Sequence, residues 1–104
     1  MYIDVVNNNN LNKFNNSCNK GVWLVWFFAD WCGHCRVMND DWNSLVNNNV
    51  HGIKYARVRD DFNSSTNLNS QPNIQGYPTI ILYKDGEQHS MHTGLRNEES
   101  LNEY

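Results

Sequence analysis

An unbroken apolar run, followed at once by two cysteines, constrains the fold of this chain more than any other feature. Residues 22–28 read VWLVWFF, and a run that is apolar at every position is typical of a central strand with helices on both faces. The run is far shorter than the roughly 20 residues that cross a bilayer. ADWCGHC follows at 29–35, and a helical stripe then places apolar residues at Val37, Met38, Trp42, Leu45 and Val46. The cysteine pair therefore lies at a strand-to-helix junction.

The remaining pattern predicts one domain in which strands and helices alternate. Strands are expected at residues 2–6, 53–58, 78–83 and 88–93, and helices around 11–18, within 60–73 and from Asn97 onward. The Asp85-Gly86 pair between the last two strands predicts a tight antiparallel hairpin. A length of 104 residues fits a single domain over 1–104.

Charge and composition narrow the range of partners. The net charge is −3, the pI is near 5.7 and no Lys/Arg cluster is present, so we expect no binding to nucleic acid or to a membrane. Asparagine occurs in runs at 7–10 and 47–49, although it is a mediocre helix former. We attribute these runs to coding bias in an AT-rich genome, and we expect the first of them to cap a helix.

The cysteine pair has three readings: a metal clamp, a structural disulfide or a reactive dithiol. A closed zinc site needs four ligands, and the other candidates are scattered along the sequence: Cys18, His51, His89 and His92. Closing a loop as short as Cys32–Cys35 removes little entropy from the unfolded chain, so a static disulfide would stabilise the fold weakly. We therefore favour the dithiol and expect no metal.

The two cysteines of a dithiol at this junction would have different roles. The unpaired N–H groups of the first helical turn favour a thiolate at Cys32, which is the nucleophile of thiol–disulfide exchange. Cys35, one turn further on, is the resolving thiol that displaces a mixed disulfide. Gly33 keeps the turn open to a substrate backbone, and His34 is expected to stabilise the Cys32 thiolate by its charge or a hydrogen bond.

Four segments together make the sequence resemble the thioredoxin family over nearly its whole length: ADWCGHC, GYPT at 76–79, YKDGE at 83–87 and HTGLR at 92–96. Among its members it looks most like the catalytic CGHC domains of protein disulfide isomerase, because thioredoxin proper has proline at the place of His34. The resemblance implies an α/β thioredoxin fold, with a central mixed sheet of about five strands flanked by about four helices. It implies no dissociable cofactor.

The resemblance also implies roles for residues outside the cysteine motif. A cis peptide between Tyr77 and Pro78 would face the cysteines, offer the Tyr77 backbone to an extended substrate and keep metal ions from the thiols. Trp31 would shield the dithiol and form part of the substrate platform, with ordinary core packing as the alternative. Arg96 would approach Cys35 and favour its thiolate, with a solvated surface arginine as the alternative.

This sequence departs from the family pattern at two places. The family usually has a buried acid on the central strand that takes the proton of the second cysteine, but the matching residue here is Trp26, and residues 21–28 contain no carboxylate. Cys35 is then expected to depend on one of three groups, Arg96, water or Asp30, and to resolve mixed disulfides slowly. Asp40 stands where the family often has proline, which predicts a weaker helix kink.

The other sulfur and the other large aromatic residues are expected in the interior. Cys18 shares a helical face with Leu11 and Phe14, so we expect a buried inert thiol, with a regulatory or intermolecular cysteine as the alternative. Trp23 and Trp42 are expected in the core.

These patterns predict a monomeric thiol–disulfide oxidoreductase of the disulfide isomerase type. The Cys32–Cys35 pair would form its redox-active disulfide, and its partners would be protein or peptide thiols and disulfides and an unidentified redox partner. The alternatives are a thioredoxin-like reductase and a non-catalytic polypeptide-binding module. We expect a cytoplasmic location by default, because no signal peptide or retention tetrapeptide is seen, although the CGHC motif also suits an oxidising compartment.

Overall fold

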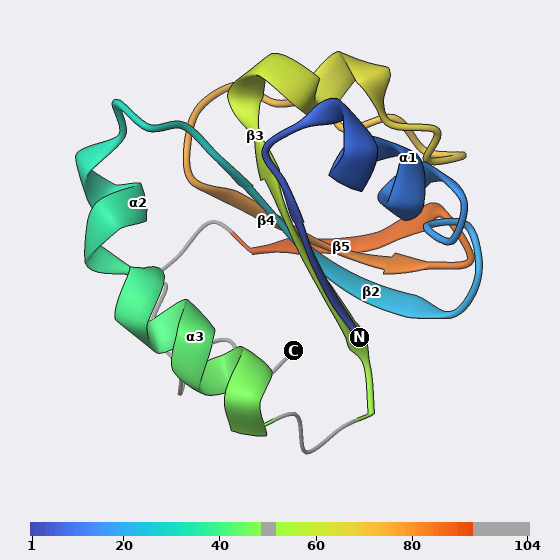
Figure 1. Cartoon of the computed structure of the whole chain (residues 1–104), viewed down its shortest axis with the longest axis horizontal. Helices are drawn as coiled ribbons and strands as arrows, with labels where there is room; N and C mark the ends of the chain where they lie inside the picture. Colours follow the sequence, from blue (N-terminus) through green and yellow to red (C-terminus); the bar gives the residue numbers. More distant parts are fainter. Residues whose placement is uncertain (49–51, 93–104) are drawn as a thin grey trace.

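The computed structural model describes residues 1–48 and 52–92, and its described strands form one mixed sheet (Figure 1). The strands lie in the order β1-β3-β2-β4-β5, with bounds β1 Tyr2–Val5, β2 Val22–Phe28, β3 Lys54–Arg59, β4 Thr79–Lys84 and β5 Glu87–His92. Strand β3 pairs in parallel with β1 and β2, whereas β4 pairs antiparallel with β2 and β5. The long apolar run is therefore the central strand, as its composition predicts.

Helices cover both faces of this sheet. They are α1 Asn8–Asn15, α2 Gly33–Val37, α3 Asn39–Asn48 and the 3-10 helix η1 Asp60–Ser65. Figure 1 shows α1 on one side of the sheet and α2 with α3 on the other. The last expected helix, from Asn97, lies outside the described residues. Within the described part of the chain, no helix is long and apolar enough to span a membrane.

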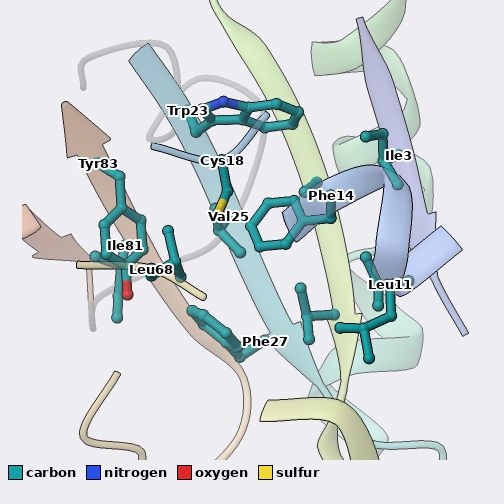
Figure 2. Packing of buried hydrophobic residues seen from close by; sticks show 13 residues of the cluster. Ile3, Leu11, Phe14, Cys18, Trp23, Val25, Phe27, Leu68, Ile81 and Tyr83 are labelled. Atoms are coloured by element: carbon teal, nitrogen blue, oxygen red, sulfur yellow. The ribbon is translucent and has the colours of Figure 1, made fainter. Parts of the chain in front are cut away.

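The central strand β2 sends alternate side chains into two separate hydrophobic clusters. Trp23, Val25 and Phe27 pack under α1 with Phe14 and Cys18 (Figure 2). The opposite face of β2 contributes a second set to the cluster under α3: Leu24, Trp26 and Phe28. Six successive residues of β2, 23–28, are thus buried on one face or the other.

The expected signals at the start of α1 and in the hairpin are confirmed. Asn7 is the N-cap of α1, and its side chain accepts a 2.8 Å hydrogen bond from the N–H of Asn10. The turn between β4 and β5 has positive φ angles at Asp85 (51°) and Gly86 (82°), as a two-residue hairpin turn requires. The Asp85 carboxylate also accepts a 2.8 Å bond from the N–H of Gly21, which joins this turn to the start of β2.

The helix after the cysteines is divided in two, which corrects one expected core position. Met38 separates α2 from α3, with φ −85° and ψ −2°, and its N–H donates to His34 and Arg36 carbonyls behind it. Met38 is buried at 2% exposure, whereas Val37 is 80% exposed. The expectation that Val37 belongs to the core stripe is wrong, because the stripe continues from Met38 to Trp42 in a new helical segment. The helix is interrupted here although Asp40 is not a proline.

Candidate active site

The two cysteines lie where β2 ends and α2 begins, and both are present as free thiols. Cys32 is the N-cap of α2, and its sulfur accepts a 3.2 Å hydrogen bond from the backbone N–H of Cys35. The side chains are nearly buried, with 5% of Cys32 and 2% of Cys35 exposed. The sulfur of Cys32 thus faces the first turn of the helix, and Cys35 lies beneath it.

Cys35 is a thiol that holds its proton tightly. Burial is the main cause that raises the pKa of Cys35 to about 12, and the hydrogen bond with the Cys32 side chain acts in the same direction. The indole N–H of Trp26 and the backbone at Ala29 act in the opposite direction. Any reaction in which Cys35 attacks must therefore remove a proton from a buried group.

The proline loop lies against the cysteines. The peptide bond between Tyr77 and Pro78 is cis, as expected. Tyr77 packs against the cluster that contains Cys32 and Cys35, and the hydroxyl of Thr79 donates a 2.7 Å bond to the carbonyl of Gly76, which closes the loop. An open hollow of about 670 Å³ runs along this loop toward β5, lined by Gly76, Tyr77, Pro78, Thr79, Gln88 and Met91, with Asn73 and Gln75 at its end.

Trp31 is a surface residue beside the cysteines and not part of the core. It is 68% exposed, its ring meets that of Tyr77 edge-on at 5.5 Å between centroids, and its indole N–H donates a 3.3 Å bond to the carboxylate of Asp60. The alternative of core packing is therefore wrong. Trp31, Tyr77 and the exposed Val37 give the area around Cys32 an apolar surface.

The buried position beneath the cysteines is aromatic, as the sequence indicates. Trp26 is 0% exposed and packs against Phe28 and Trp42, with ring centroids 5.5 and 5.3 Å away. It shares a hydrophobic cluster with both cysteines. Asp30, one of the three groups considered for Cys35, is exposed at the surface.

One charged residue of the site was missed by the sequence analysis. Arg57 of β3 is directly opposite Trp26 in the sheet register, and its guanidinium carbon lies 5.6 Å from the Trp26 ring and 4.5 Å from the Phe28 ring. Asp4 of β1 holds it through two hydrogen bonds of 2.9 and 2.7 Å. The sequence did contain a signal for this residue. Side chains alternate along the expected strand at 53–58, which puts Arg57 on the same face as the apolar Tyr55.

The other predicted site residues divide into two groups. Gly33 and His34 are both exposed on α2, and a side chain added at Gly33 would meet open space. Their roles in access and thiolate stabilisation remain predictions. Arg96 lies outside the described residues.

Comparison with known proteins places the chain in a family. The thioredoxin family model matches residues 3–104. A thioredoxin domain-containing protein of Theileria parva is 37% identical over 84 residues, which are 81% of this chain and 37% of that protein. A putative protein disulfide-isomerase of Schizosaccharomyces pombe is 34% identical over 84 residues, 80% of this chain and 17% of its own length. The chain thus spans well under half of these relatives.

Solved structures agree with this match. The thioredoxin of Fasciola hepatica superimposes with a TM-score of 0.71 at 29% identity, covering 97% of this chain and 93% of that one. The sheet order and the helices on its two faces are therefore those of the thioredoxin fold. The chain belongs to the thioredoxin family, and it carries the CxxC pair of a thiol–disulfide oxidoreductase at Cys32 and Cys35.

Proposed function

We propose that this chain exchanges disulfides with protein or peptide substrates in the manner of protein disulfide isomerase. The observation that carries the proposal is the position of the Cys32 sulfur, at the start of α2 and 3.2 Å from the backbone nitrogen of Cys35. The cis-proline loop and the exposed Trp31 supply a surface on which an extended polypeptide can lie beside this sulfur. The CGHC sequence and the disulfide isomerases among the relatives support the isomerase type.

The reaction has two exchange steps. The Cys32 thiolate attacks one sulfur of a substrate disulfide, so that a mixed disulfide forms and one substrate thiolate leaves. Cys35 then loses its proton and attacks the Cys32 sulfur, which forms the Cys32–Cys35 disulfide and releases the second substrate thiolate. Run backwards, the same steps transfer a disulfide to a reduced substrate. No cofactor takes part, because the two electrons pass between sulfur atoms.

The direction of transfer separates the isomerase from a thioredoxin-like reductase. We would equilibrate the protein in graded glutathione buffers and measure the fraction with the Cys32–Cys35 disulfide. A potential near the roughly −180 mV of protein disulfide isomerase supports oxidation and isomerisation. A value near the roughly −270 mV of thioredoxin would make the protein a reductase despite its His34.

A second candidate is a thioredoxin-fold module that binds polypeptides without turnover. The buried indole of Trp26, in the place of an acid, is the observation that favours it. Alkylation of Cys32 in a Cys35→Ser variant near pH 6 separates the two functions, because a binding module has no need of an unusually reactive thiol. Slow alkylation, like that of a free small-molecule thiol, together with no exchange in glutathione would leave only the binding module.

A further inference from the structure

A small cavity opens behind the resolving cysteine. Its volume is about 160 Å³, and the lining includes Trp26, Asp30, Cys35, Arg36, Asn39 and Arg57. A water molecule takes up about 30 Å³ in the liquid, so the space is large enough for a short chain of waters. It connects the buried sulfur of Cys35 to the exposed loop at Asp30.

Trp26, which lines this cavity, carries a buried donor that has no protein partner in the described part of the chain. The indole nitrogen of Trp26 is buried and forms no hydrogen bond within the described part of the chain, although buried indole N–H groups usually have one. It lies close enough to Cys35 to lower the pKa of that thiol. The indole N–H therefore favours the thiolate that forms when Cys35 loses its proton.

Neither of the two arginines that line the cavity, Arg36 and Arg57, can take a proton. Arg57 stays protonated throughout the accessible pH range, and its three donor nitrogens are engaged by Asp4 and by Asn39, the latter at 3.1 Å. The carboxylate of Asp4 is held in the ion pair on the far side of the guanidinium.

Asp30 is the carboxylate at the mouth of the cavity. Among the described residues that line the cavity, it alone has a carboxyl group, and its charge contributes to the raised pKa of Arg57. Arg36 donates bonds of 3.2 and 2.9 Å to the Asp30 carbonyl, which fixes this loop against α2. Among the described residues, the charged or titratable groups that line the cavity or act on Cys35 or Arg57 include Asp4, Asp30, Arg36, Arg57, Cys32 and the Tyr77 hydroxyl.

We propose that this cavity is the proton exit of the resolving step, with Asp30 as its terminal acceptor. The inference rests on the proposed function. Cys35 gives its proton to water in the cavity, and Asp30 accepts a proton from the outer end of the water chain and releases it to solvent. The Cys35 sulfur bonds to the Cys32 sulfur as the bond from Cys32 to the substrate sulfur breaks.

The mixed disulfide itself helps this transfer. The hydrogen bond and the charge of Cys32 both raise the pKa of Cys35 in the dithiol, and both are lost once the Cys32 sulfur is bonded to substrate. Burial remains, so a base is still required. A base inside the sheet is what the family pattern supplies, and this chain has Trp26 there instead.

The test is a stopped-flow reaction of the reduced protein with an aromatic disulfide whose thiolate is coloured. Attack by Cys32 releases the first coloured thiolate at a rate proportional to probe concentration. Resolution by Cys35 releases the second at a rate independent of it. Asp30→Asn should slow the second phase about tenfold or more. The matched control is Asp40→Asn, because Asp40 is exposed at the start of α3 and does not line the cavity.

The outcomes separate this inference from the proposed function. Equal second phases in Asp30→Asn and Asp40→Asn, with equal pH profiles, would overturn the proton exit while leaving the exchange reaction intact. A wild-type protein that releases no second thiolate would overturn the proposed function and the inference together. Trp26→Phe keeps an aromatic ring and removes the N–H, and a slowed second phase with an unchanged first phase would support loss of the Cys35 proton on the cavity side.

Discussion

Asn19 is half-buried and lies outside the helices and strands, where substitutions usually have small effects. Asn19→Ala should nevertheless destabilise the fold clearly. The Asn19 side chain donates a 2.8 Å bond to the Asn67 carbonyl and accepts a 3.0 Å bond from the N–H of Asn69. Asn15 repeats this arrangement on Ser65 and Asn67, with bonds of 3.1 and 2.8 Å. Two side-chain amides thus pair with the extended segment after η1 as a neighbouring strand would, and hold it against the end of α1.

The expected loss of free energy of unfolding follows from the two hydrogen bonds that the Asn19 side chain forms. Each bond contributes about 0.5–1.5 kcal/mol net, and partial exposure places both in the lower part of that range. Asn19→Ala should therefore reduce the free energy of unfolding by about 1–2 kcal/mol. For a domain of this size, that lowers Tm by roughly 5–15 °C.

Urea denaturation of the reduced protein at neutral pH measures this loss. The control is Asn12→Ala, because Asn12 is exposed on α1 and alanine is the better helix former, which should raise stability by up to about 0.5 kcal/mol. The slope of the transition should be the same for both variants, since neither changes the surface exposed on unfolding. If Asn19→Ala and Asn12→Ala unfold at the same urea concentration, the amide pairing contributes nothing and the reasoning is wrong.

Four further substitutions test other parts of the structure. Burial raises the pKa of the Tyr83 hydroxyl, so stability should fall as the pH rises above about 10, the ordinary pKa of tyrosine in an unfolded chain; Tyr83→Phe should flatten that fall in urea denaturation. Trp31→Ala should raise KM for a peptide disulfide about fivefold or more while changing stability by less than about 0.5 kcal/mol, because Trp31 is mostly exposed. Gly52 and Gly86 both have positive φ, but only at Gly86 would a side chain collide with Asn19. Gly52→Ala should therefore cost about 1–2 kcal/mol and Gly86→Ala about 2–5 kcal/mol in thermal unfolding.

Local patterns predicted the framework of the fold, because each depends on neighbours in sequence. The apolar run gives β2, and the Asp85-Gly86 pair gives the hairpin. The asparagines are different. Asn7 could be recognised as a cap from its place before a helix, whereas the pairing of Asn19 with the segment near residue 68 depends on tertiary position. Coding bias as the origin of the asparagine runs stays a prediction.

The active site likewise contains some residues that local sequence patterns predicted and others that only the tertiary structure brings together. Cys32 and Cys35 are adjacent on one helical turn, so spacing alone predicted that they would meet. Arg57 comes to the site only because β3 pairs with β2 in a register that sets it opposite Trp26. Alternation along a strand gives the face on which a side chain lies, but not its partner across the sheet. The hydrogen bonds to Asp4 were hidden for the same reason, since β1 joins the sheet beside β3.

This chain has Trp26 where the family pattern has a buried acid, and this difference bears on which reaction the site favours. Trp26 is fully buried among aromatic rings, so replacing it with glutamate would leave a cavity and a buried charge, at about 3–5 kcal/mol. This position is therefore used for packing, and in the proposed proton exit the base for Cys35 is Asp30 at the rim of the cavity. A resolving step that depends on a distant base is slow, and a slow resolving step prolongs the mixed disulfide. Reduction gains nothing from that delay, whereas isomerisation needs the substrate to stay attached to Cys32 while its other thiols rearrange. The loss of the buried acid thus supports the isomerase type over the reductase.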